Sequence, residues 1–449
     1  MKKLLSLLVA AVMVLALGMA AGAADYGAMA GDLAAIGMFT GTDVGYELDR
    51  EPTRAEVAVM LVRLLGAEET AKADFAAGTI SHPFSDVADW AAPHVAYLYT
   101  NKLTDGVSDA EYGSALLCSG QMYCTFMLRA LGYSDAEGGD FTYAAALDFA
   151  AEKGLADKAF VANFKRDELV AVSYQALSTP VKGGAQSLLE KLIAAGAIDG
   201  TKAAAITEKL AILKEYDALA LKNVEDYKSL DCSGTMNIAA TVGGQTMNMS
   251  DVYRHMKMKV DESAIEGEIV METSDPNGGM PTIVHQWMKD GYVYIERGEE
   301  RYKTQMDYSR MLETLQSSTG IAGSSMTSTA AAYMFTSVTK TQTDEGTLYE
   351  FALAPKLFNS LMGGILGNAS LSADSIVSFG SMVERILIKD GAVKNIKMSF
   401  DYSVPLEGMG EMTTQYSADL TVNAIGDDVV ITFPDFTDFA DESAQVQGE

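Results

Sequence analysis

Arginine side chains at the start of two expected helices are the clearest candidates for binding chemistry. Arg54 follows Thr53 and precedes Glu56, and Arg166 precedes Glu168 at the same spacing. A guanidinium group is a planar fork of N–H donors that holds a carboxylate through two parallel hydrogen bonds. These positions could therefore bind an acidic ligand, or each arginine could form an ion pair within its own chain.

Residues for catalysis or metal binding are sparse. The four histidines are His82, His94, His255 and His285, and no zinc-protease, nucleophile-elbow or phosphate-loop motif occurs. His255 and His285 fall on alternating segments and could be neighbours, but a pair without further ligands is more typical of ordinary polar residues. We therefore expect no enzyme activity, no cofactor and no metal.

Composition and charge narrow the class of protein. The chain has 449 residues, which is more than a single hydrophobic core usually serves. Its content of 48% hydrophobic and 21% charged residues is typical of folded domains. The formal charge of −28 would repel nucleic acid and anionic lipid headgroups, so neither is an expected partner. Cys118, Cys124 and Cys232 form neither a disulfide framework nor a C-x-x-C pair, and we expect three buried thiols.

The first 24 residues have the pattern of a secretory signal peptide. Lys2 and Lys3 precede the apolar run Leu4–Leu17, and Ala21-Gly22-Ala23 supplies a small-residue cleavage site. Cleavage near Ala23 or Ala24 would release a secreted protein. A second apolar run of this kind does not occur, so we expect no membrane span.

Three segments of the N-terminal half share a plan of helix, glycine-bearing loop and second capped helix. The clearest contains Phe84-Ser85-Asp86-Val87 and Trp90-Ala91, with Ser85 or Asp86 as the expected cap of the first helix. Its second helix is expected from Gln121 to Leu131. The upstream segment opens its second helix with Thr53-Arg54-Ala55-Glu56, a capping box, and the downstream one with Phe164 to Glu168.

These motifs resemble the S-layer homology (SLH) domain, whose pattern is an F-x-D-V start, W-A in the first helix and T-R-A-E at the second. The resemblance covers roughly residues 26–180 and implies attachment to a secondary cell-wall polymer, an acidic and often pyruvylated glycan. It implies polymer contacts for Arg54, Arg166, Trp90 and Glu56, although Trp90 could instead fill the core. The middle unit has Cys118-Ser119-Gly120-Gln121 where T-R-A-E belongs, so its groove would lack the arginine.

From Ser233 onward the apolar period changes from helical to alternating, which is typical of strands. The expected strands include Met236–Val242, Met256–Val260, Glu268–Thr273, Ile283–Lys289, Tyr292–Glu296, Leu348–Leu353, Ile396–Val404, Tyr416–Val422 and Val429–Phe433. Short turns such as Asp290-Gly291 and Asp390-Gly391 indicate a large antiparallel sheet, meandering or closed. Two apolar helical pieces, Tyr308–Leu315 and Pro355–Leu366, interrupt it.

This order of elements resembles the LolA/LppX group of lipoprotein carriers over roughly residues 224–437. The resemblance rests on Val224–Ser229 before the first strand, Tyr292-Val293-Tyr294 after a turn, and a final strand at Phe433-Pro434-Asp435. It implies a concave apolar face that binds acyl chains. Seventeen of the 25 methionines follow residue 230, and their flexible thioethers suit varied apolar ligands, although they could equally be ordinary core. The expected contacts are Met256, Met258, Trp287, Phe358 and Met362.

Together these features predict a two-domain α+β protein. The expected segments are a signal peptide (1–24), an SLH-like helical repeat domain (26–199), a helical linker (200–223), a large curved antiparallel β domain or half-barrel with helical insertions (224–437) and an acidic disordered tail (438–449). The favoured function is an exported cell-surface protein held non-covalently on the cell-wall polymer, whose β domain has a binding or structural role. The alternative is an envelope carrier that binds lipid or another apolar ligand in the concavity of the β domain.

Overall fold

The computed structural model describes most of the chain beyond residue 25. The described residues are 26–41, 44–156, 158, 160–222, 229–260, 264–274, 279–305, 332–355, 378–380, 382–406 and 410–442. They form two compact units. The helical unit holds the described residues up to 213 together with 332–336, and the sheet unit holds those of 214–305 and 337–442.

Short helices build the helical unit. They are α2 (Gly27–Ala35), α3 (Arg54–Leu64), α4 (Glu68–Ala76), α5 (Ala92–Thr100), α6 (Gly120–Ala130), η1 (Tyr143–Ala145), α7 (Ala146–Glu152), α8 (Arg166–Ser178), α9 (Leu188–Ala194) and the first part of α10 (Ala204–Lys222). A 3-10 helix from far along the chain, η3 (Ala332–Met334), packs against α8. The backbone N–H of Ala332 donates to Gln175 Oε1 at 2.7 Å, and the Tyr333 ring stacks on Phe160.

Capping residues determine where two of these helices begin. Glu56 N donates to Thr53 Oγ1, and Thr53 N donates to Glu56 Oε2 at 2.8 Å, so the capping box predicted at α3 is confirmed. Ser119 caps α6 by accepting from Met122 N. The helix cap predicted at Ser85 or Asp86 is wrong, because α5 begins only at Ala92 and has no side-chain cap.

The starts of α3 and α8 are held by loops in the same manner. Arg54 N donates to Leu116 O, and Arg166 N donates to Arg50 O, each at 2.9 Å. The acceptor residues, Arg50 and Leu116, lie 66 positions apart (116 − 50) in the loops before α3 and α6. These two helices also begin 66 positions apart (120 − 54), so the two loops occupy equivalent places in their segments. Two of the segments that look related in sequence therefore also share a local geometry.

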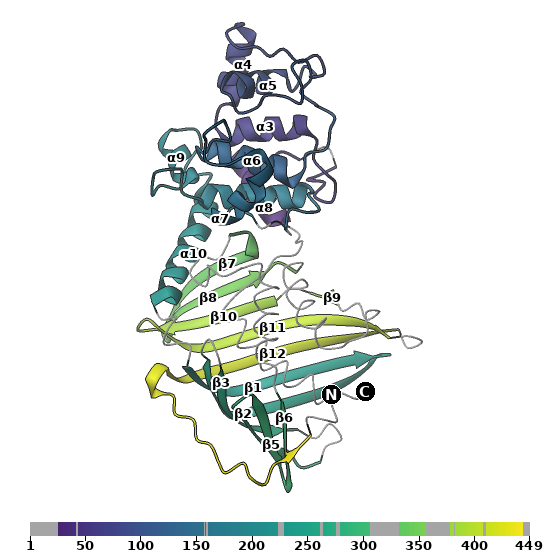
Figure 1. The fold of residues 1–449 in the computed structure, drawn as a ribbon, viewed down its shortest axis with the longest axis vertical. Coiled ribbons are helices and arrows are strands. Elements are labelled where there is room, and N and C mark those ends of the chain that lie inside the picture. The colour runs from purple at the N-terminus through teal and green to yellow at the C-terminus, as the bar shows by residue number, and fades with distance from the viewer. Residues whose placement is uncertain are drawn as a thin grey trace. The chain divides into compact units, whose positions relative to one another are not determined.

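Among the described residues, thirteen strands form the sheet of the second unit. Figure 1 shows this sheet as a ribbon. They are β1 (Ser229–Val242), β2 (Gln245–Val260), β3 (Ile265–Thr273), β4 (Thr282–Lys289), β5 (Tyr292–Arg297), β6 (Glu300–Gln305), β7 (Phe335–Thr343), β8 (Gly346–Leu353), β9 (Ser378–Phe379), β10 (Met382–Lys389), β11 (Ala392–Leu406), β12 (Gly410–Ile425) and β13 (Ala440–Asp441). The spatial order is β13-β6-β5-β4-β3-β2-β1-β12-β11-β10-β8-β7, with β9 beside β11. The predicted large curved antiparallel sheet is confirmed in its open rather than its closed form.

The two faces of this sheet differ in chemistry. Cross-strand partners share a face, and residues two apart along a strand do so as well. By this register every methionine in the described strands lies on one face, which we call the methionine face. These residues are Met236, Met247, Met249, Met256, Met258, Met271, Met288, Met382, Met398 and Met412. The opposite face, here called the polar face, presents Ser, Thr, Asn, Gln and Asp side chains along β1, β11 and β12.

The C-terminal segment corrects one predicted strand. Residues 429–433 form no strand, and the final pairing is the short β13, which runs parallel to β6. In Figure 1 this yellow segment leaves the end of β12 and reaches the edge strand β6. Its aromatic residues Phe433, Phe436 and Phe439 recur every third position, so a period-two strand could not place all three on one face. Pro434 also lacks the N–H that a sheet ladder needs.

Candidate functional site

Arg54, expected to bind the polymer, is 5% exposed. Its Nε donates to Tyr112 O at 3.0 Å, and its guanidinium carbon lies 4.8 Å from the centre of the Tyr112 ring. The same loop is held from another direction by Asp86, whose carboxylate accepts from the backbone N–H groups of residues 112, 113 and 114. Arg54 and Asp86 therefore fix one loop of the helical unit.

Arg166 has an equivalent environment and is 3% exposed. Its Nε donates to Tyr46 O at 2.9 Å, and its guanidinium carbon lies 4.7 Å from the centre of the Phe39 ring. Its Nη1 lies 3.5 Å from Glu56 Oε1. Tyr46 and Tyr112 are again 66 positions apart (112 − 46), so each arginine supports the corresponding loop of a different segment.

Glu56 is engaged by its own chain. Arg50 Nη2 forms an ion pair with Glu56 Oε1, and the Thr53 backbone N–H donates to the other carboxylate oxygen. Burial alone would raise the pKa of Glu56, but the hydrogen bonds from Arg50 and Thr53 outweigh it and lower that pKa to about 2. The carboxylate is charged at neutral pH. It caps the start of α3 and forms ion pairs with Arg50 and Arg166.

Trp90 is the one member of the predicted polymer-binding set that faces solvent, with 57% of its surface exposed. It therefore does not fill the core. Within the described residues, no hydrogen bond or ring contact joins Trp90 to Arg54 or Arg166. The structure brings Arg166 and Glu56 together and places Arg54 and Trp90 elsewhere.

Met256 and Met258 are both buried on the methionine face. Beside them Gly267 leaves space for two thioethers, because a Cβ at this position would lie 2.7 Å from Met258 Sδ and 2.6 Å from Met288 Cε. A β-bulge in β2, between Tyr253 and His255, brings Met256 onto the same face as Met249. The methionines of β2, β3 and β4 therefore form one continuous surface.

Trp287 lies on the polar face, because it pairs with Glu268 and Tyr294 rather than with a methionine-face residue. There it forms an aromatic cluster with Tyr294 and Phe439, against which Tyr292, Phe433 and Phe436 pack. The Phe436 ring stacks on Tyr294 with 3.8 Å between ring centres. Trp287 is therefore apart from Met256 and Met258, while Phe358 and Met362 lie outside the described residues.

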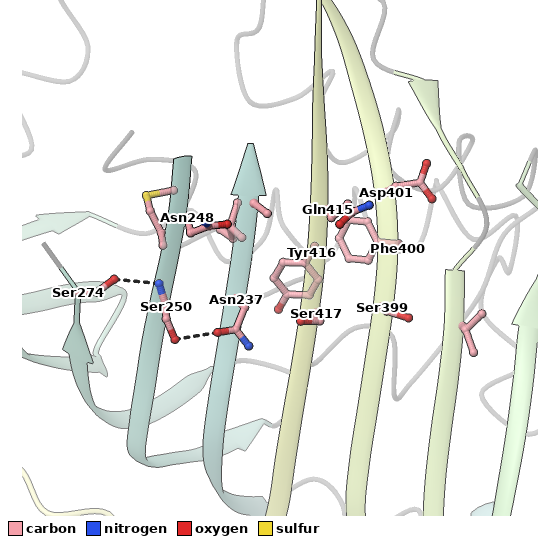
Figure 2. A pocket seen from close by; sticks show the side chains of 14 residues that line it. Asn237, Asn248, Ser250, Ser274, Ser399, Phe400, Asp401, Gln415, Tyr416 and Ser417 are labelled. Carbon is pink, nitrogen blue, oxygen red and sulfur yellow. Dashed lines mark hydrogen bonds between the residues drawn. The ribbon is translucent and has the colours of Figure 1, made fainter. Parts of the chain in front are cut away.

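A polar trough of about 630 Å³ crosses the middle of the sheet and was not predicted from sequence. Its lining residues come mainly from β1, β2, β11 and β12, as Figure 2 shows: Asn237, Ile238, Ala239, Asn248, Met249, Ser250, Ser274, Val383, Ser399, Phe400, Asp401, Gln415, Tyr416 and Ser417. By register most of these side chains belong to the polar face, whereas Ile238, Met249, Phe400 and Tyr416 belong to the methionine face. Ser250 Oγ donates to Asn237 Oδ1, and Ser250 N donates to Ser274 Oγ (Figure 2).

Buried polar groups interrupt the methionine face. Asp251 and Tyr416 are both on this face, and each has a side-chain oxygen without a hydrogen-bond partner in the described part of the chain. Burial raises the pKa of the Asp251 carboxyl against the opposing effect of a hydrogen bond from Thr273, and desolvation raises the pKa of Glu384, a half-buried residue of β10, to about 7. Sequence reasoning missed both carboxyls, since acidic residues are too frequent in this chain to draw attention.

All three cysteines are free and buried, as expected. No group of three potential metal ligands occurs among the residues that the structure describes. No helix within the described ranges has the length and apolarity required to cross a bilayer.

Comparisons with known proteins found partial likenesses among solved structures only. No family model matches the chain, and no curated protein does. Among solved structures, LprF from Mycobacterium bovis matches with 10% identity and a TM-score of 0.24, covering 51% of this chain and 97% of LprF. A DUF1329 family protein from Desulfovibrio piger matches with 11% identity and a TM-score of 0.20, covering 49% of this chain and 95% of that one. At these TM-scores the likenesses assign neither a family nor a function, and the chain is similar to these proteins in part only.

Proposed function

We propose that the sheet unit is a carrier in the cell envelope that binds a flexible apolar ligand, such as the acyl chains of a lipid, on its methionine face. The observation that carries this proposal is the segregation of all ten methionines of the described strands onto one face. Unbranched, polarizable thioethers adapt to apolar ligands of varied shape. The signal-peptide pattern of residues 1–24 is consistent with this location.

Exposure at one end of the methionine face supports a ligand surface rather than an ordinary core. Met247 is 52% exposed, and Met249 and Met412 are half-buried, whereas Met256 and Met258 are fully buried. The apolar surface therefore continues from the interior to solvent near the β1–β2 turn. An acyl chain could enter at that end without unfolding the sheet.

The change Met249→Glu should weaken binding of the neutral apolar fluorophore N-phenyl-1-naphthylamine at least tenfold. A carboxylate at this half-buried position would have to be desolvated beside the ligand, which costs more than the ~1.4 kcal/mol of a tenfold change. The matched control is Asn248→Glu, which adds the same charge one residue away on the polar face. Fluorescence titration of the purified full chain measures both, and native mass spectrometry tests for co-purified lipid. Equal losses in the two variants, or no binding by the unchanged protein, would contradict the proposal.

A second function is favoured by one observation, the exposed indole of Trp90. We propose that the helical unit binds an acidic cell-wall polymer, with Trp90 stacking on a sugar ring. The buried arginines would support the loops around such a site rather than grip the carboxylate themselves.

The change Trp90→Ala should reduce the fraction of protein that sediments with polymer-bearing wall sacculi about fivefold, because the exposed ring is the contact surface. Leu116→Ala, which removes another exposed apolar side chain of the same unit, should leave sedimentation unchanged. Sedimentation that is insensitive to Trp90, or that persists after the polymer is removed, would exclude this function.

A further inference from the structure

Three polar side chains are buried among the methionines of the central strands. Asp251, Thr414 and Tyr416 are 7%, 1% and 3% exposed, respectively. Asp251 Oδ1, Thr414 Oγ1 and Tyr416 Oη each lack a hydrogen-bond partner within the described residues. Buried polar atoms are nearly always paired. Among the described residues the Thr273 hydroxyl, opposite Asp251 on β3, bonds the Asp251 carboxyl, and the remaining oxygens call for a partner from outside these residues.

The sheet register places Asp251 and Tyr416 close together. Asp251 on β2 is opposite Met236 on β1, and Tyr416 on β12 is opposite Ile238, two residues further along β1. Only β1 therefore separates the two side chains. The negative charge of Asp251 contributes to raising the pKa of Tyr416, after the larger effect of burial, as expected for a phenol close to a carboxylate.

The charge of this surface excludes one class of headgroup. Methionine-face positions along β1, β3 and β12, and those of β2 from Gln245 to Met258, include no lysine or arginine. The carboxyls on this face are those of Asp251, of Glu384 on β10 and, near the sheet edge, of Glu300 on β6, which is opposite Arg297 on β5. A carboxylate or phosphate beside Asp251 would meet like charge without a compensating cation. A group that donates hydrogen bonds would instead find an acceptor.

We propose that Asp251 and Tyr416 form a headgroup seat, in which an amphiphile with a hydroxyl or ammonium headgroup binds in preference to one with a carboxylate or phosphate. The ligand donates to Asp251 Oδ1, and the Tyr416 hydroxyl donates to a ligand oxygen or accepts from a second donor. The acyl part of the same ligand lies along the methionines toward Met249 and Met247. This inference rests on the proposed carrier function and adds the class of ligand.

The test is displacement of bound N-phenyl-1-naphthylamine from the full chain by three ligands with the same sixteen-carbon chain. Monopalmitoylglycerol and hexadecylamine should each displace the fluorophore at a concentration at least tenfold lower than palmitate, measured at pH 8. In Asp251→Asn this difference should shrink to about threefold or less, because palmitate no longer meets a like charge. Asp401→Asn, an exposed carboxyl on the polar face of β11, should leave the preference unchanged.

Tyr416→Phe provides a second variant with the same shape. It should weaken displacement by monopalmitoylglycerol about threefold and leave palmitate unaffected. Equal displacement by all three ligands, or a preference for palmitate, would overturn the headgroup seat while leaving apolar binding intact. Failure of the unchanged protein to bind the fluorophore would instead overturn the carrier function.

Discussion

Replacing Arg54 by alanine is expected to lower the free energy of unfolding of the helical unit by about 3 kcal/mol. The change removes the charged donor to Tyr112 O, leaves that carbonyl without its partner, and empties the space over the Tyr112 ring. Arg54→Lys should recover little of this loss, because an ammonium group cannot reproduce the planar Nε–H contact. Urea unfolding followed by far-UV circular dichroism measures the change.

The control for Arg54 is Lys72→Ala. Lys72 forms exposed ion pairs with Glu68 and Glu69, and such pairs contribute about 1 kcal/mol or less. An Arg54→Ala protein with unchanged stability that no longer binds the wall polymer would show that the guanidinium contacts ligand. That outcome would restore the sequence-based assignment of Arg54.

Replacing Phe439 by alanine should destabilise the sheet unit by about 3 kcal/mol. Phe439 is buried against Trp287 and Tyr294, and it holds the C-terminal segment over the polar face of β4 and β5. Its loss should let water reach Trp287. In a Trp90→Phe background Trp287 is the remaining tryptophan, so its emission should move to longer wavelength and the urea midpoint should fall.

Val430→Ala is the matched control for Phe439, since it truncates an exposed residue of the same C-terminal segment. Its expected effect on stability is within about 0.5 kcal/mol. Unchanged Trp287 emission in Phe439→Ala would mean that the aromatic cluster does not depend on the C-terminal segment. The segment would then be a passive extension of β12.

The two faces of the sheet have different roles in the proposed function of this unit. The methionine face carries the proposed ligand surface, and the C-terminal aromatic cluster seals part of the polar face. The polar trough lies mainly on the polar face, over β1, β2, β11 and β12. Substitutions that probe ligand binding can therefore be paired with controls from the opposite face of the same strand.

Several strands were predictable because their apolar residues alternate. Residues 283–289 and 292–296 lie within β4 and β5, and the Asp-Gly turn between them is a tight reversal with Asp290 at a positive φ of 51°. β6, β7 and β10, and the short β9 and β13, were not predicted. Glu300–Gln305 and Phe335–Thr343 are mostly polar or charged, so their pairing depends on neighbouring strands rather than on an apolar pattern.

The candidate site was predictable only in part. The sequence alone indicated a methionine-rich apolar surface and correctly associated Met256 with Met258, because residues two apart in a strand share a face. The alternation of side chains along a strand also places Trp287 and Met288 on opposite faces of the sheet. It does not show which of the two lies on the same face as the methionines of β2. That choice depends on the register between β3 and β4.

The sequence by itself therefore determined local structure: the capping box of α3, the alternating strands and the concentration of methionine beyond residue 230. Tertiary structure alone decided which groups meet. The bulge in β2 unites Met249 with Met256, a loop from another segment encloses Arg54, and the C-terminal segment covers Trp287. Backbone period and capping act over a few residues and can be seen in the sequence. Burial and side-chain contacts involve residues that are far apart in the sequence. Only the folded chain brings these residues together.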